Sequence, residues 1–140
     1  MTSPRQHAVF ADTSAWIALF LKNDHNHSDA VTLYKKIQDS QILLYTSDYI
    51  IDETVTLMMQ KSGYRSSLAI GNAILSNRDI EIIFINPDYF AGCWKHYCKF
   101  RDKNFSYTDV ASFYLMDTLN IAQAFSFDRH FIQAGFALIH

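Results

Sequence analysis

The sequence predicts an α/β fold, a three-layer α/β/α sandwich around a central, mostly parallel sheet. Short apolar runs that suit buried strands alternate along the chain with amphipathic stretches that suit helices. Strands separated by helices imply parallel pairing, with helices on both faces of the sheet. The chain has 140 residues, of which 49% are hydrophobic, and only 4 Gly and 2 Pro. This composition indicates one globular domain over residues 1–140 rather than a disordered or repeat protein, with residues 1–6 as a flexible tail.

The first half of the chain predicts two strands and four helices. Apolar runs over residues 7–11 and 42–45 suit buried strands. Residues that can cap a helix, such as Asp12, Ser28 and Ser47, precede the helical patterns. The predicted helices cover residues 15–20, 28–38, 49–61 and 64–77.

The second half predicts three further strands and a buried helix. Residues 80–85 form an apolar run, and Pro87 can then stand in the first turn of a helix. Ser106-Tyr107-Thr108-Asp109 fits the capping-box pattern, and the helix that follows, to about Ala122, is apolar on nearly every side. The predicted C-terminal elements are strands over residues 124–127 and 136–139, separated by a short helical turn that starts at Asp128 and stops near Gly135.

Four acidic residues lie beside apolar segments, although only 19% of the residues are charged: Asp12, Glu53, Asp109 and Asp128. Asp12 and Asp128 each end a predicted strand, and functional groups of open α/β sheets gather outside the carboxyl ends of strands. Asp109 opens the buried helix. Glu53 falls at the margin of its helix's apolar face, whereas Asp52 points away from that face. Because carboxylates in such places are costly unless compensated, we expect the four to converge.

Converging carboxylates indicate a metal site. They raise one another's pKa values, so they stay ionised together chiefly when a cation is present. Oxygen ligands point to Mg²⁺ or Mn²⁺, and such an ion can activate a water molecule that attacks a phosphodiester. Hydroxyl groups close in sequence to the acids can hold carboxylates or water in place: Thr13, Ser14, Ser106 and Ser126.

Each of these acids also has an ordinary structural interpretation. Asp12, Asp109 and Asp128 can be helix caps, and Glu53 can be a helix-flank residue. The predicted acidic pocket is absent only if all four of these interpretations are correct. Asp117 lies eight residues beyond Asp109, about 12 Å along a helix axis, which is too far to share one ion.

Net charge does not identify the partner. Twelve Lys and Arg against fourteen Asp and Glu give −2, which does not favour nucleic-acid binding. If the four acids hold a metal, however, basic residues outnumber the remaining acids. A basic cluster interleaved with aromatic residues then suits RNA phosphate contact and base stacking: Lys95, Lys99, Arg101 and Lys103. An amphipathic helix with solvated lysines is the simpler explanation of this pattern.

Other features of the sequence indicate a cytoplasmic protein without a membrane segment. The longest apolar runs are too short to span a bilayer, and the N-terminus lacks the apolar region of a signal peptide. Cys93 and Cys98 match no common zinc spacing, so we expect reduced thiols. His25 and His27 are expected at the surface, and neither His96 nor His130 has a spacing that marks a metal ligand.

The order of the acidic motifs resembles that of PIN-domain ribonucleases. Phe-Ala-Asp12-Thr-Ser-Ala-Trp is followed by Asp-Glu53-Thr-Val-Thr-Leu, then Ser-Tyr-Thr-Asp109-Val-Ala-Ser-Phe, then Phe-Ser-Phe-Asp128-Arg-His-Phe with Ala-Gly-Phe beyond it. The resemblance covers essentially the whole chain. The single-domain length is similar to the VapC-type toxins of prokaryotic toxin–antitoxin pairs.

This resemblance implies a metal-dependent endoribonuclease that uses Mg²⁺ or Mn²⁺, is restrained by a cognate antitoxin protein and forms a homodimer. Asp12 and Asp109 match the family's usual direct metal ligands. Glu53 and Asp128 match positions that help to hold metals, water or substrate, and the matching supporting hydroxyls are those of Thr13 or Ser14 and Ser106. Ser126 stands where many relatives have threonine, and Asp52 is the competing match for the second acid.

Three other functions remain open at this stage. A housekeeping PIN nuclease that processes RNA or cuts DNA would have the same acidic pocket, because such a pocket recognises phosphate and metal rather than a sugar. A catalytically silent RNA- or protein-binding module would retain only the fold. A phospho-accepting signalling domain is disfavoured, since Ala11 rather than a second acid precedes Asp12 and residues 126–129 include no lysine.

Overall fold

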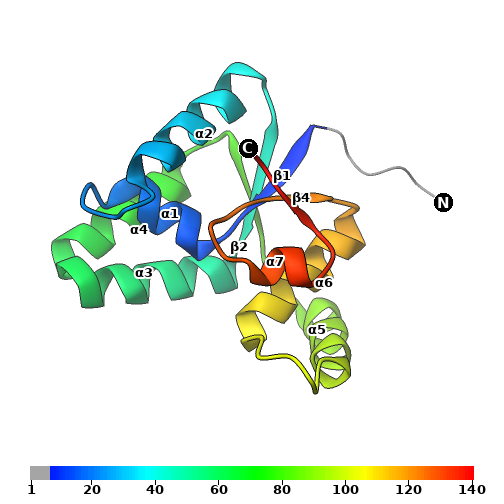
Figure 1. Ribbon diagram of the computed structural model, residues 1–140. Coiled ribbons are helices and arrows are strands. Elements are labelled where there is room, and N and C mark those ends of the chain that lie inside the picture. The colour runs from blue at the N-terminus through cyan, green and yellow to red at the C-terminus, as the bar shows by residue number, and fades with distance from the viewer. Residues whose placement is uncertain (1–6) are drawn as a thin grey trace.

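Five parallel strands form the sheet of the structure, a computed structural model that describes residues 7–140 (Figure 1). The strands lie in the order β3-β2-β1-β4-β5. The tail expected over residues 1–6 lies outside the described residues. The strand bounds are β1 Ala8–Ala11, β2 Leu43–Ser47, β3 Ile80–Ile83, β4 Gln123–Phe125 and β5 Ala137–Leu138.

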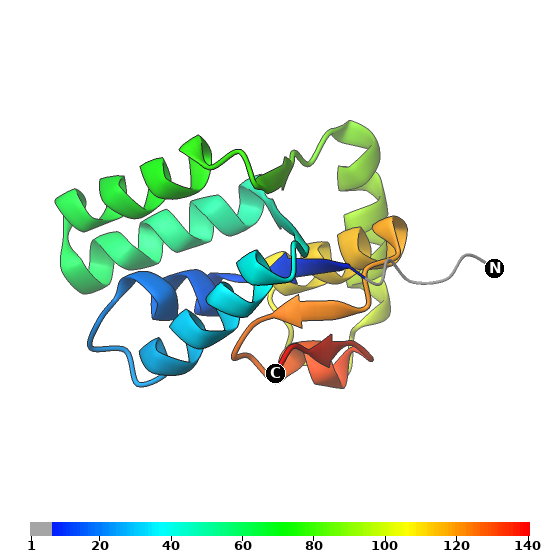
Figure 2. The ribbon, with the colours of Figure 1, turned by 90° about the horizontal axis from the view of Figure 1, so that it is seen from above.

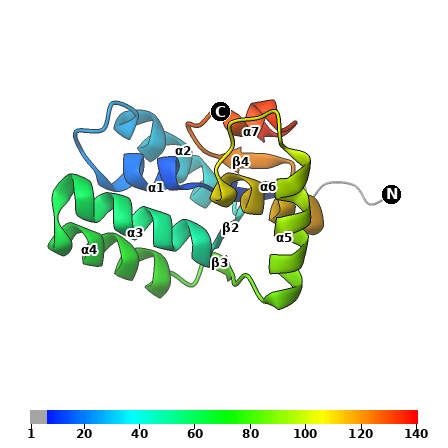
Figure 3. The ribbon, with the colours of Figure 1, turned by 90° about the horizontal axis from the view of Figure 1, so that it is seen from below.

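Helices cover both faces of this sheet. Within residues 7–140 they are α1 Thr13–Phe20, α2 His27–Asp39, α3 Asp48–Ser62, α4 Tyr64–Ser76, α5 Pro87–Lys99, α6 Tyr107–Leu119 and α7 His130–Gln133. Figures 2 and 3 show α1 to α4 gathered on one side of the strands and α5 to α7 on the other. The α/β/α sandwich with a parallel sheet, predicted from the sequence, is confirmed.

The direction of the crossovers reverses between β1 and β4. From β1 the chain passes to β2 and then β3 on one side, and it returns to place β4 and β5 on the other side of β1. In open α/β sheets, the crevice outside the carboxyl ends at such a switch point is the usual ligand site. Asp12 directly follows β1, and its backbone N–H donates to the Phe125 carbonyl at the end of β4 (3.0 Å).

The sheet and α6 form the centre of the hydrophobic core. All four residues of β1 are buried, as are Trp16, Phe113 and Phe131 from the two helical layers. Fully burying a side chain of this kind contributes about 1.5–3 kcal/mol. Trp16 Nε1 donates to Thr46 Oγ1 (3.3 Å), and this hydroxyl donates to the Ala11 carbonyl (3.0 Å), so both of these buried side-chain groups are paired. The buried helix expected after Ser106 is therefore confirmed as α6.

The observed element ends correct several of the predicted ones. Helix α6 ends at Leu119 rather than near residue 122, because Asn120 adopts a left-handed conformation (φ 59°). Strand β4 ends at Phe125 rather than at residue 127, because the Phe127 N–H donates to the hydroxyl of Ser14 instead of a neighbouring strand. The last helical turn begins at His130, two residues after Asp128. Strands β3 and β5 are also shorter than the apolar runs that predicted them.

Among residues 7–140, no helix is both long and apolar enough to cross a bilayer. Both cysteines lie in α5 and are free, Cys93 buried and Cys98 exposed. Burial raises the pKa of the Cys93 thiol to about 11, so this thiol stays protonated at neutral pH.

Candidate functional site

Asp12 is a buried carboxylate at the end of the central strand. It caps α1, where its Oδ2 accepts from the backbone N–H of Ser14 (3.4 Å) and from the Ser14 hydroxyl (2.9 Å). The Ser126 hydroxyl donates to the same oxygen (3.0 Å), and the residue is only 3% exposed. Burial, with a smaller contribution from the nearby charge of Asp109, raises the pKa of Asp12 to about 6 against the lowering effect of these hydroxyls. Asp12 is thus a helix cap in a position where its charge is costly.

Ser14 and Ser126 join the ends of β1 and β4. Their hydroxyl oxygens lie 3.1 Å apart. Ser14 Oγ also accepts from the Phe127 N–H (2.9 Å), and Ser126 Oγ accepts from the Asp128 N–H (3.0 Å). The two serines therefore hold Asp12 and the backbone that leads to Asp128 in one hydrogen-bonded network. This position of Ser126 is compatible with the supporting role expected from the sequence.

Asp109 combines a capping role with a contact to a distant residue. Ser106 Oγ accepts from the Asp109 N–H (3.0 Å), and Asp109 Oδ2 accepts from the Ser106 N–H (3.2 Å), which completes the predicted capping box. Asp109 is 8% exposed, and the same Oδ2 lies 2.8 Å from Nδ1 of His130. The Asp109 carboxylate therefore caps α6 and also contacts His130 at the start of α7.

His130 brings Asp109 and Asp128 together. Its Nδ1 lies 3.4 Å from Asp128 Oδ1, and its backbone N–H donates to that oxygen (2.9 Å). One ligand atom from each of the three side chains lies within 4.8 Å of the others. Because Nδ1 faces carboxylate oxygens, we assign its proton there, which leaves Nε2 as the available nitrogen if the ring is neutral. Sequence reasoning missed His130, and its only local signal is the spacing Asp128-Arg129-His130.

Glu53 is not joined to this network by a hydrogen bond. It is half-buried on α3, and within the described part of the chain its carboxylate makes no hydrogen bond or ion pair. Its neighbour Thr54 donates to Thr13 Oγ1 (3.3 Å), which places this turn of α3 beside the start of α1. Thr13 thus links two helices rather than holding Asp12 through its hydroxyl. Asp52 is exposed, as its place on the helix predicts.

Asp117 lies away from the acidic cluster. Its side chain is 59% exposed and lies 3.5 Å from His96 Nε2. This position agrees with the prediction that Asp117 lies too far along the helix from Asp109 to share one ion with it.

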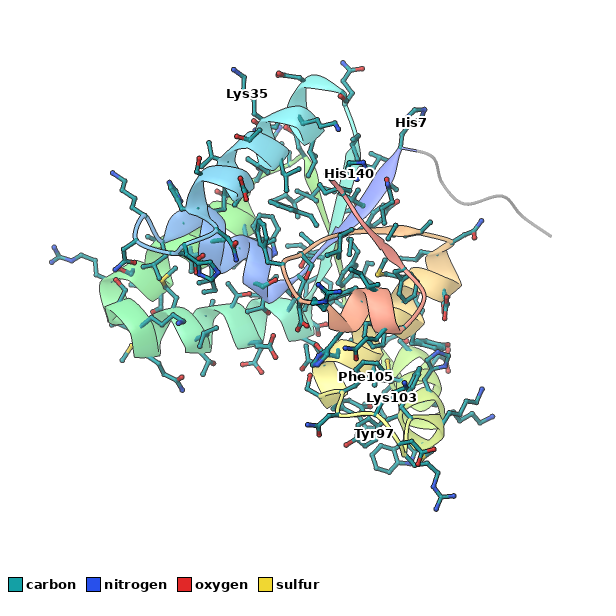
Figure 4. All side chains as sticks on the ribbon, in the orientation of Figure 1. His7, Lys35, Tyr97, Lys103, Phe105 and His140 are labelled. Atoms are coloured by element: carbon teal, nitrogen blue, oxygen red, sulfur yellow. The ribbon has the colours of Figure 1, made fainter. Side chains whose placement is uncertain are left out.

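The predicted basic cluster lies on the surface of α5 and the loop beyond it. Lys95, Lys99, Arg101 and Lys103 are all exposed, and Figure 4 labels Lys103 and Tyr97 in the region of the end of α5. The aromatic residues between them divide into two groups. Phe100 and Phe105 pack edge-on against Phe113, with ring centroids 6.2 and 5.0 Å away. Trp94 and Tyr97 are exposed and cover Tyr107.

The donor groups at the switch point fit a divalent cation. Asp109 and Asp128 supply carboxylate oxygens, which Mg²⁺ and Mn²⁺ prefer, and an imidazole nitrogen of the kind His130 offers suits Mn²⁺ better than Mg²⁺. Among the described residues, Asp12 is not part of this three-residue group, but it is buried near Asp109. The raised pKa of Asp12 is the clearest sign of this fit, because a nearby cation would offset both its burial and the charge of Asp109.

Comparison with known proteins identifies the class. The family model described as PIN domain matches residues 9–137, so the chain belongs to the PIN-domain family, as its motif order indicated. Relatives include the 23S rRNA-specific endonuclease VapC20 of two Mycobacterium tuberculosis strains, CDC 1551 / Oshkosh and ATCC 25618 / H37Rv. Each is 29% identical over 128 residues, covering 91% of this chain and 95% of the relative. The crystal structure of Mycobacterium tuberculosis VapC20, described as a sarcin–ricin-loop-cleaving toxin, matches with a TM-score of 0.85 and 27% identity over 92% of this chain and 96% of that one.

Proposed function

We propose that this protein is an endoribonuclease of the VapC type, the toxin of a toxin–antitoxin pair, and that it hydrolyses RNA phosphodiester bonds with Mg²⁺ or Mn²⁺. The observation that carries the proposal is the meeting of Asp109, Asp128 and His130 at the carboxyl ends of the strands of a PIN-domain sheet, with the buried Asp12 close enough to Asp109 for the charge of Asp109 to raise its pKa. The likeness to VapC20 extends over nearly the full length of both chains, which supports the same class of reaction.

In this proposal, Asp12 and Asp109 are the direct metal ligands. Asp128 and Glu53 hold a second ion or water. A bound divalent cation supplies charge neutralisation at the phosphodiester and lowers the pKa of the attacking water. Ser14 and Ser126 hold Asp12 through Oδ2, which fixes this carboxylate before substrate arrives.

His130 and Ser106 orient the other two carboxylates. His130 donates toward Asp109 and lies close to Asp128, so it limits the rotation of both side chains. Ser106 ties the Asp109 carboxylate to the start of α6. A site held in this way needs little rearrangement when charge develops on the phosphate.

The proposed partners are RNA, a cognate antitoxin protein and a second copy of this chain, all in the cytoplasm. Since the similar VapC20 is described as specific for 23S rRNA and as cleaving the sarcin–ricin loop, ribosomal RNA is the first substrate to test. Asp12→Asn removes one charge with little change of shape, and Asp117→Asn makes the same change at an exposed position.

The experiment incubates purified protein with 23S rRNA and with a stem-loop of the sarcin–ricin sequence, in Mg²⁺, Mn²⁺ or EDTA. We expect cleavage by the wild type and by Asp117→Asn with a divalent metal, and none by Asp12→Asn or in EDTA. Undiminished cleavage in EDTA would contradict the mechanism. RNA binding without cleavage in any metal would favour a silent binding module instead.

Toxin and housekeeping nuclease differ in their effect on a cell. A toxin should arrest growth when expressed alone, and the product of an adjoining gene should relieve the arrest. A housekeeping nuclease would cut RNA in vitro without arrest or relief.

A further inference from the structure

A groove leads away from the acidic cluster along one side of the molecule. Its volume is about 540 Å³, and at the cluster end it is lined by Ser14, Asp128 and His130. A neighbouring hollow of about 390 Å³ shares three lining residues with it, namely Asp24, His25 and Lys61. The two hollows therefore adjoin and extend from the site to the loop between α1 and α2 and the last turn of α3. The groove alone is within the range of about 300–1,000 Å³ that is usual for ligand sites.

The groove combines apolar side chains with basic ones. Ile17, Leu57 and Phe127 contribute the apolar surface. Lys61 and Arg129, both exposed, contribute positive charge. Neither cation forms an ion pair with any carboxylate of residues 7–140, so both charges are available to a ligand.

The two acids that line the groove are already engaged with backbone N–H groups. Asp24 Oδ1 accepts from the Asn26 N–H (2.8 Å), and Asp128 Oδ1 accepts from the His130 N–H (2.9 Å). Basic side chains here would offset the repulsion between the acidic cluster and an approaching polyanion. An aromatic ring beside cations is also the combination that binds unpaired nucleotides, by stacking on the base and neutralising the phosphate.

We propose that this groove is the subsite for an unpaired nucleotide adjacent to the scissile phosphate, with Lys61 and Arg129 on backbone phosphates and Phe127 against a base. This inference rests on the proposed function, because it assumes an RNA substrate. It shifts the expected RNA contacts from Lys95, Lys99, Arg101 and Lys103 to basic residues that line the same hollow as Asp128 and His130. No residue of that α5 cluster lines either hollow.

The test measures RNA binding separately from cleavage. Fluorescein-labelled sarcin–ricin stem-loop RNA is titrated with full-length protein in the Asp12→Asn background, by anisotropy at several NaCl concentrations. The groove variants are Lys61→Gln, Arg129→Gln and Phe127→Leu, and thermal melting by circular dichroism verifies that each is folded. The matched control is Lys35→Gln, on an exposed position of α2 that lines neither hollow and stands at the outer edge in Figure 4.

We expect Lys61→Gln and Arg129→Gln each to weaken binding severalfold and to reduce the slope of log K against log salt by about 0.7, the value for one phosphate contact of a single strand. Phe127→Leu should weaken binding by about fivefold or more without changing the slope, because it removes stacking rather than charge. Lys35→Gln should change neither quantity.

Two outcomes would overturn the inference. In the first, Lys61→Gln and Arg129→Gln bind RNA as the Asp12→Asn parent does, while Lys99→Gln combined with Lys103→Gln weakens binding, which assigns RNA to α5 and the loop beyond it. In the second, the groove variants lose binding to the cognate antitoxin but not to RNA, which assigns the groove to a protein. If binding depends on the groove but the metal-loaded wild type cuts no RNA, the proposed function fails, and the groove is an RNA-binding site without a scissile phosphate beside it.

Discussion

The two ends of the sheet carry hollows of similar size but of different chemistry. At the amino end of β2 and β3, a cavity of about 520 Å³ is lined by residues that include Tyr34, Arg78, Asp79 and Glu81. The charged side chains there are exposed and solvated. At the carboxyl end, the groove of about 540 Å³ meets a site whose Asp12 is almost wholly buried.

This difference shows that cavity volume alone does not identify the functional site in this fold. An exposed carboxylate such as Asp79 costs little, because water stabilises its charge. A buried carboxylate such as Asp12 raises the free energy of the folded state unless a partner offsets it. Buried charge held by hydroxyls, rather than available space, distinguishes the carboxyl end as the site.

The largest expected effect comes from removing one carboxylate charge at each end. Asp12→Asn should lower the rate of RNA cleavage by on the order of 100-fold or more, since loss of groups that merely support metal ligands already costs about 10–100-fold. Asp79→Asn, the matched change at the amino end, should leave the rate unchanged. Initial rates in Mn²⁺ measure both. Equal losses in the two variants would contradict the contrast between the ends.

The second prediction concerns the stability of the metal-free protein. The pKa of Asp12 is about 6 in the folded state against an ordinary value of 3.8, so folding favours its protonated form. Its stabilising contribution is complete below about pH 4 and is lost as pH rises through about 6. At about 1.4 kcal/mol per pKa unit, the loss is up to about 3 kcal/mol.

Urea unfolding in EDTA between pH 4 and pH 8 measures this loss. Asp12→Asn should lack the corresponding pH dependence and should be more stable than the wild type at pH 7.5. Adding Mn²⁺ should restore the wild type and leave Asp12→Asn nearly unchanged. A wild type that gains stability from pH 4 to pH 7 relative to Asp12→Asn would contradict the assigned burial of charge.

A smaller effect is expected at His130, which lies between two carboxylates. His130→Ala should lower the cleavage rate by about 10–100-fold, the range for residues that orient metal ligands. Higher Mn²⁺ should restore part of the rate, because the loss is one of metal affinity. His96→Ala is the control, since His96 contacts the exposed Asp117. A rate loss that no Mn²⁺ concentration relieves would indicate a different role for His130.

The fold was predictable from the sequence because its signals are local. An apolar run such as residues 7–11 or a capping box such as that of Ser106 and Asp109 can be recognised within a few positions. The predicted end of strand β4 lies two residues too far along the chain, because the true end depends on Ser14, 113 positions away from Phe127. Local pattern contains no information about such a contact.

The same distinction explains which parts of the site were found. Asp12 and Asp109 stand at element ends and could be selected as acids in costly positions. His130 could not, because its significance depends on Asp109, 21 positions earlier, and on the turn that Asp128 makes with its backbone N–H. The groove could not be predicted from the sequence either, since its lining residues extend from Ser14 to Gln133.

The smallest effects should come from deleting one hydroxyl at each end. At the amino end, Tyr34 Oη accepts from Asn77 Nδ2 (3.2 Å), and Tyr34→Phe should cost about 1 kcal/mol or less without altering cleavage. At the carboxyl end, Ser126→Ala removes a donor to a buried carboxylate and an acceptor for the Asp128 N–H. This loss should cost about 1–3 kcal/mol at pH 7.5 with Mn²⁺, because buried groups are left unsatisfied.

Each of these two variants lacks one oxygen atom. Their urea unfolding and cleavage rates therefore allow a direct comparison of the two ends. Ser126→Ala should also slow cleavage, since Asp12 then depends on Ser14 alone for its side-chain hydroxyl donor. Ser126→Thr retains the hydroxyl and should restore most of the activity. If Tyr34→Phe slowed cleavage as much as Ser126→Ala, the amino end would be part of the working site, and the distinction drawn from buried charge would be wrong.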